Sequence, residues 1–301
     1  MKSTLISGAM MAFCLSSFAS TTIIPVETDA TALVYSVADN GRVYQNYFGK
    51  RLDNAAEYAN LPAGKEAYLT HGMEDYYEPA LHINRTATPN SSTLLKYKKH
   101  EVVKHDGYTE TIITMADPEF ADEVKLHIAA FGPENVFKSW TEITNNEKQP
   151  IELEKYASSM LHFNAPQYFL TQYTGKWAKE ANQLNQELHF GKKVIDTKLG
   201  ARADMFASPF FQLSLGEPAT ETSGDVLTGT LAWTGNFRFV FEVDDFGDLR
   251  VISGINPYFS AYPLAKGQTF TTPEFIFTLS DEGTGQASRN LHDWARNHQV
   301  K

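Results

Sequence analysis

Apolar and polar residues alternate with a period of two along most of this 301-residue chain, and this pattern restricts it to one fold class. In the segment 123–131, for example, Val124, Leu126 and Ile128 alternate with Lys125. Because successive side chains of a strand point to opposite faces, the pattern predicts a half-buried antiparallel strand. Six further segments show it: 31–38, 42–48, 80–85, 109–115, 137–144 and 275–279. The sequence therefore predicts an all-β, antiparallel fold.

Turn residues separate these predicted strands. Asp39-Asn-Gly41, Asp106-Gly107 and Phe246-Gly-Asp248 lie between apolar runs, where hairpins need residues that tolerate positive φ. No linker rich in Pro or Ser and no repeat of fixed period interrupts the chain. We therefore predict one large β-sandwich over residues 20–285.

Two segments have helical spacing. Apolar residues in 177–188 recur at helical intervals, but the segment is rich in Asn and Gln, so a helix and an extended edge strand remain equally open. The segment 286–301 places Ala287, Leu291 and Trp294 on one stripe after a Gly-rich turn. This predicts a short C-terminal connecting helix.

The N-terminus is typical of a secretory signal. Lys2 is followed by an apolar stretch, and Ser17 and Ala19 are small residues at cleavage-site positions, so residues 1–19 are predicted to be a signal peptide. The stretch is too short to span a membrane. The only cysteine is Cys14, so the mature chain is expected to lack disulfides and thiol chemistry. We expect an exported bacterial protein, periplasmic or extracellular.

Charge and motifs exclude several function classes. The formal net charge is −10 without an extended basic patch, which argues against a nucleic-acid or membrane partner. The short motifs of serine hydrolases, nucleotide enzymes and zinc sites do not occur.

Asp244 and Asp245 are adjacent, and neighbours on a strand point to opposite faces, so they are not expected to share a site. No catalytic residue, metal site or cofactor is assigned. The many aromatic residues suit either sugar stacking or a plain core.

Seven motifs occur in order along the chain. The longest is Gly-Thr-Leu-Ala-Trp-Thr-Gly-Asn-Phe at 229–237. The others are Tyr-Phe-Gly-Lys-Arg-Leu at 47–52, Glu-Pro-Ala-Leu at 78–81, Thr-Gly-Lys-Trp-Ala-Lys-Glu at 174–180, Gly-Ile-Asn-Pro at 254–257, Phe-Thr-Thr-Pro-Glu at 270–274 and Ala-Ser-Arg-Asn-Leu-His-Asp-Trp-Ala-Arg at 287–296. Together they resemble the N-terminal domain of glycoside hydrolase family 36 α-galactosidases. The resemblance implies a galactose-mutarotase-like β-supersandwich.

The resemblance also implies a role in α-galactoside hydrolysis. Enzymes of this family continue into a (β/α)₈ barrel whose two aspartates, a nucleophile and an acid/base, hydrolyse terminal α-galactosides with retention. The segment 286–301 matches the family's connector helix, so both aspartates and the barrel are expected to be missing from this chain. The implied partners are an α-galactoside and a barrel domain. Apolar surface around Leu291 and Trp294 is expected to be uncovered and to favour a homo-oligomer.

Two other functions stay open. One is a stand-alone carbohydrate-binding or assembly module without hydrolase activity. The other is an independent mutarotase-like enzyme, which would need a paired His and Glu in the sandwich cleft that the sequence does not identify.

The resemblance supplies two candidate substrate-binding residues. The family's Gly-x-Trp segment contributes a sugar-contacting tryptophan, and Gly175-Lys-Trp177 matches it, with a core tryptophan as the alternative. A second family contact is an aspartate in a long loop after the Phe-Gly-Lys strand. Asp53 occupies this region, but the loop is shorter here, and an ordinary surface residue is the alternative. Four further residues of the motifs are predicted to be structural: Asn236, Gly254, Asn256 and Pro257.

Overall fold

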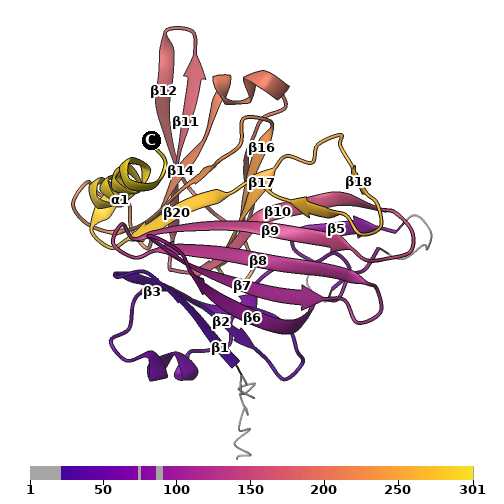
Figure 1. Ribbon diagram of the computed structural model, residues 1–301. Helices are drawn as coiled ribbons and strands as arrows, with labels where there is room; N and C mark the ends of the chain where they lie inside the picture. The colour runs from indigo at the N-terminus through magenta and orange to yellow at the C-terminus, as the bar shows by residue number, and fades with distance from the viewer. Residues whose placement is uncertain (1–21, 74–75, 86–90, 301) are drawn as a thin grey trace, which may run out of the picture.

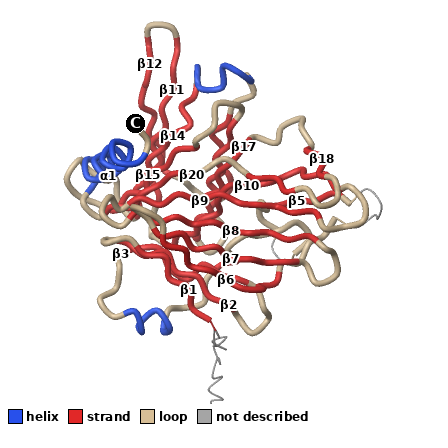
Figure 2. The backbone as a smooth tube through the Cα atoms, in the orientation of Figure 1, coloured by secondary structure: helices blue, strands red, loops and turns tan. Residues whose placement is uncertain are grey.

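The computed structural model describes residues 22–73, 76–85 and 91–300, and the paired strands within these ranges are antiparallel (Figure 1). The predicted signal peptide, residues 1–19 with Cys14, lies outside the described residues. Strands dominate the fold (Figure 2), so the predicted all-β class is confirmed. None of the helices in the described ranges is long and apolar enough to cross a membrane.

Three sheets make up the fold. The first contains β1 (Thr22–Glu27), β2 (Thr31–Val37), β3 (Val43–Lys50) and β4 (Lys65–Glu66). The second contains β13 (Gly191–Asp196), β16 (Phe237–Val243), β17 (Asp248–Ile255), β10 (Ile151–Asn164), β18 (Tyr262–Leu264) and β5 (Leu81–Asn84).

The third sheet has ten strands and forms the larger layer of the supersandwich. In spatial order its main path is β12 (Lys179–Glu187), β11 (Tyr168–Lys176), β14 (Ala207–Leu215), β15 (Asp225–Leu231), β20 (Phe275–Ser280), β9 (Val136–Asn145), β8 (Asp122–Phe131), β7 (Thr109–Ala116) and β6 (Lys96–Lys104), and β19 (Thr269–Thr271) pairs with β9. Two 3₁₀ helices, η1 (Ala55–Asn60) and η2 (Gly200–Met205), lie in connecting segments.

One aromatic-rich core lies between the sheets. Phe137 and Phe277 stack at 5.5 Å, and Phe211 meets Phe239 edge to face at 5.1 Å. A Cβ on Gly229 would lie 2.5 Å from the ring of Phe275, so only glycine fits at this point of the 229–237 motif. Burying each Phe stabilises the fold by roughly 1.5–3 kcal/mol.

The polar residues of the same motifs fix the connections. Asn236 Oδ1 accepts a hydrogen bond from the Gly200 amide at 2.7 Å, and Asn256 Nδ2 donates to the Thr197 carbonyl at 2.9 Å. Gly254 faces the β-bulge in β10, where a Cβ would come within 3.1 Å of the Ser158 amide nitrogen. The structural roles predicted for these three residues are confirmed.

The segment 177–188 is not a helix. It forms the turn and second strand of the β11–β12 hairpin, and β12 pairs with β11 from Glu187 to Lys179. This hairpin projects from one end of the molecule (Figure 1). Its helical spacing arises by chance, because both faces of β12 are largely exposed and carry no core pattern.

The predicted C-terminal helix is confirmed as α1 (Gly283–His298) and begins three residues before the predicted boundary at 286. Gly283, with φ of 77°, starts it. The expectation of uncovered apolar surface around Trp294 is wrong. Trp294 is buried against Phe131, with ring centroids 5.7 Å apart, and Leu291 packs at the edge of the same cluster. The apolar stripe of α1 packs against the outer face of the ten-stranded sheet.

Candidate functional site

The tip of the β11–β12 hairpin presents Trp177. Its side chain is 95% exposed, so the alternative of a core tryptophan is excluded. Trp177 and Ala178 form a two-residue turn between the paired residues Lys176 and Lys179. Ala178 has φ of 56° and Ala181 has φ of 53°, a left-handed conformation that costs a residue with a Cβ roughly 1–2 kcal/mol. A two-residue hairpin turn requires positive φ, so the turn geometry accounts for the conformation of Ala178.

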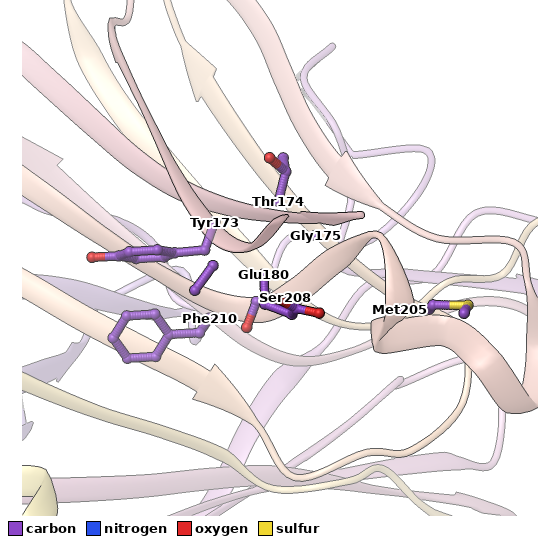
Figure 3. Close-up of a pocket in the computed structure, with 8 residues that line it drawn as sticks. Tyr173, Thr174, Gly175, Glu180, Met205, Ser208 and Phe210 are labelled. Carbon is purple, nitrogen blue, oxygen red and sulfur yellow. The ribbon is translucent and has the colours of Figure 1, made fainter. Parts of the chain in front are cut away.

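A pocket of about 390 Å³ lies between this hairpin and η2 (Figure 3). The rings of Tyr173 and Phe210 lie on one side of it, 5.5 Å apart, and Met205 lies on the other. The Gly175 amide donates to the Phe206 carbonyl at 3.1 Å, and a Cβ on Gly175 would approach the Met205 carbonyl oxygen to 2.8 Å. The glycine of the Gly-Lys-Trp motif therefore lets β11 pass close to η2.

The phenol of Tyr173 is held in place below the tip. Its hydroxyl donates to Gln212 Oε1 at 2.8 Å, and burial raises its pKa above the usual value. It therefore stays protonated at neutral pH and acts as a hydrogen-bond donor rather than as a base.

Asp53 lies at another place in the fold. It is exposed between β3 and η1, and it lines a cleft of about 720 Å³ together with Lys50, Arg51 and four further acidic residues, Asp29, Asp225, Asp281 and Glu282. The β3–η1 segment and the β11–β12 hairpin tip lie at opposite ends of the molecule (Figures 1 and 2). Trp177 and Asp53 of one chain are therefore not brought together.

The adjacent carboxylates Asp244 and Asp245 have separate partners, as predicted, although they lie in the turn between β16 and β17 and not on a strand. Asp244 is buried and accepts hydrogen bonds from the Phe246 and Asp248 amides, both at 2.9 Å. Asp245 accepts a hydrogen bond from the Tyr77 hydroxyl. They do not form a catalytic pair. No group of three or more His, Cys, Asp or Glu side chains in the described ranges is arranged to hold a metal ion.

A His–Glu cluster on the outer face of β7, β8 and β9 was not predicted from the sequence. The Glu110 carboxylate is shared by His127 Nδ1 at 2.7 Å and His105 Nε2 at 2.9 Å, and the His127 ring stacks on Trp140 at 4.8 Å. Because Glu110 and His127 lie on the face of the sheet opposite the core residues, the cluster is outside the interior of the sandwich. It does not supply the pair that a mutarotase-like enzyme would need in the sandwich cleft.

A second ionic cluster surrounds Glu78 of the Glu-Pro-Ala-Leu motif. Its carboxylate lies 2.7 Å from Lys155 Nζ, 2.9 Å from Lys192 Nζ and 3.3 Å from Arg238 Nη1. Burial opposes ionisation of Glu78, but the hydrogen bonds and charges of these cations outweigh it and lower its pKa to about 2. The cluster joins the start of the Glu-Pro-Ala-Leu segment to β10, β13 and β16, so its role is structural.

These features define a β-supersandwich domain with an exposed aromatic hairpin and no catalytic constellation within its described residues. Residues 41–265 match the family model of the glycosyl hydrolase family 36 N-terminal domain. The chain belongs to this family.

Named relatives agree with this assignment. Probable alpha-galactosidase G of Aspergillus terreus is 29% identical over 288 residues, which cover 87% of this chain and 39% of that protein. Alpha-galactosidase AgaA of Geobacillus stearothermophilus is 28% identical over 248 residues, covering 77% of this chain and 33% of the relative. The crystal structure of AgaA superposes with a TM-score of 0.85 at 22% identity, over 93% of this chain and 44% of that one. The chain thus spans less than half the length of these relatives.

Proposed function

We propose that this chain is the N-terminal domain of an α-galactosidase that hydrolyses terminal α-D-galactosyl residues with retention. In this proposal the domain supports and partly lines the active site of a (β/α)₈ barrel. The observation that carries it is the family match over residues 41–265, together with relatives that are named α-galactosidases and are more than twice as long. We further propose that the protein is exported after removal of residues 1–19.

Trp177 is the proposed substrate contact of this domain. Its indole is exposed on a projecting hairpin, where a partner surface can reach it, and a sugar ring packs well on an indole face. The β3–η1 segment, which carries Asp53, lies at the opposite end of the molecule from the hairpin tip (Figure 1), so the two residues cannot contact one sugar from the same chain. A homo-oligomer, in which Asp53 of one copy approaches the site served by Trp177 of another, would reconcile both assignments.

A fusion to the barrel of AgaA tests the proposal. We expect the fused protein to hydrolyse an aryl α-galactoside, and we expect the AgaA barrel alone and the present chain alone to be much less active. The barrel alone is the matched control for intrinsic activity. A soluble fusion that is no more active than the barrel alone would contradict a supporting role for this domain.

A stand-alone carbohydrate-binding module is the second candidate function. One observation favours it: a polar groove on the hairpin side of the large sheet, lined by aromatic and amide side chains.

A further inference from the structure

A groove of about 790 Å³ lies where β12, β11 and β14 meet the start of α1. Its volume is in the range of small-molecule sites, about 300–1,000 Å³. One wall is the face of the three strands, and the other is formed by residues 218–221 and the first residues of α1. We call it the amide groove, defined by Phe169, Thr171, Tyr173, Gln183, Asn185 and Gln212.

The register of the three strands builds the floor of the amide groove. Asn185 of β12 pairs with Thr171 of β11, and Thr171 pairs with Gln212 of β14, so these three side chains form one row across the sheet. Phe169 and Tyr173 precede and follow Thr171 by two residues on the same face. Their positions are about 13 Å apart along the strand. The floor therefore offers two half-buried aromatic rings separated by a polar row.

Hydrogen bonds within the row orient its amides. Asn185 Oδ1 accepts from Thr171 Oγ1 and from Gln183 Nε2, both at 2.9 Å, and Gln212 Oε1 accepts from the Tyr173 hydroxyl at 2.8 Å. Each carbonyl oxygen is thus engaged, while the NH₂ groups of Asn185 and Gln212 make no hydrogen bond to another residue in the described ranges. Two oriented NH₂ groups, each with two N–H donors, remain available to a ligand.

The charge of the lining selects the ligand class. Glu187 and Glu221 line the amide groove, and no lysine, arginine or histidine does so among the described residues. An anionic ligand would meet these carboxylates with no cation among the lining side chains, in a chain of net charge −10. A neutral ligand with many hydroxyl groups and apolar C–H faces matches both the amides and the aromatic rings.

We propose that the amide groove binds a neutral oligosaccharide, with Phe169 and Tyr173 stacking on sugar rings and the Asn185 and Gln212 amides donating to hydroxyl oxygens. This binding activity belongs to the chain itself: it rests on the second candidate function, for which it names the site and the ligand class, and it goes beyond the support of a barrel domain. It requires no hydrolysis, and the spacing of the two aromatic residues favours a chain of sugars over a single one.

Titration calorimetry of the chain with raffinose, stachyose and maltohexaose tests the proposal, with an oligogalacturonate as the charged comparison. We expect saturable binding of at least one neutral probe and weaker binding of the oligogalacturonate. Asn185→Ala and Gln212→Ala should each weaken binding about fivefold, the value of one hydrogen bond. Asn182→Ala is the matched control, because Asn182 lies on the opposite face of β12 and should change binding less than twofold.

Several results would overturn the proposal. They are the absence of saturable binding for all neutral probes, equal loss in Asn182→Ala and Asn185→Ala, and binding of the oligogalacturonate as tight as that of the neutral probes. If Asn185→Ala unfolds, as judged by circular dichroism, Gln212→Ala on β14 carries the test with the same expectation. Failure here leaves the barrel-fusion experiment unaffected, because that experiment measures hydrolysis, so the two proposals can fail separately.

Discussion

The Glu78 cluster should contribute acid-sensitive stability to this fold. The carboxylate is nearly buried and pairs with Lys155, Lys192 and Arg238, which lower its pKa from 4.5 to about 2. Each pH unit between these values corresponds to about 1.4 kcal/mol, so the upper bound is roughly 3 kcal/mol. Because the lysines are partly exposed, solvent screening reduces the expected contribution to about 1–2 kcal/mol. Glu78→Gln should lower the free energy of unfolding at pH 7 by that amount.

The direction of the Glu78 pKa shift determines how the stability difference changes with pH. A carboxylate whose pKa is lower in the folded state stabilises the fold above its unfolded pKa of about 4.5. This stabilisation is lost as the pH falls toward 2. The difference between the wild type and Glu78→Gln should therefore be constant from pH 8 to pH 5 and should shrink below pH 5.

Urea unfolding at a series of pH values measures this difference, because carboxylates outside the cluster titrate equally in both proteins and cancel. Glu119→Gln is the matched control, since Glu119 is exposed, and it should change stability by less than about 0.5 kcal/mol. A Glu78→Gln variant as stable as the wild type at pH 7 would refute the reasoning, as would a difference that persists unchanged at pH 2.

Three further substitutions have defined outcomes. Ala178→Gly should raise the free energy of unfolding by about 1 kcal/mol, because glycine adopts positive φ without strain; an unchanged midpoint in urea would argue against strain at the tip. Phe277→Ala should cost about 3–5 kcal/mol, because its ring is fully buried in the core, and a loss below 1 kcal/mol in the same assay would contradict this. Trp177→Ala should leave the melting temperature within experimental error but lower kcat/KM of the barrel fusion several-fold; unchanged kinetics would end its candidacy as a substrate contact.

The strands that the sequence predicts best are those with one face in the core. The alternation in 123–131 corresponds to β8 (Asp122–Phe131), and that in 109–115 to β7 (Thr109–Ala116). In the first half of β8 and along β9 (Val136–Asn145), burial itself alternates with a period of two, so there the pattern and the structure share one physical cause. Burial does not alternate along β12, because both of its faces are largely exposed. The helical spacing of its apolar residues therefore does not reflect burial, and pairing with β11 determines its conformation.

The sites were less predictable than the strands, because they depend on register between strands. The His–Glu cluster combines Glu110 from β7 with His127 from β8, and the amide groove combines Thr171 with Asn185 and Gln212 from its two neighbouring strands. The local sequence does not indicate which residues face each other across neighbouring strands. Local composition alone could have drawn attention to β12, where Asn and Gln are concentrated on an edge strand.

The dependence on strand register also explains why a local motif predicts Trp177 but no motif predicts the groove beside it. The short motif Gly175-Lys-Trp177 contains the residues that shape the turn. Gly175 allows β11 to approach η2 closely, and Trp177 follows at the exposed tip of the hairpin. The groove beside it has no such motif, because its residues come from β11, β12, β14 and α1. The exposed Trp177 and the amide groove nevertheless share β11, and Tyr173 lines both the pocket below the tip and the groove. The two proposed sites therefore lie on one structural element, the β11–β12 hairpin, which no single sequence motif describes.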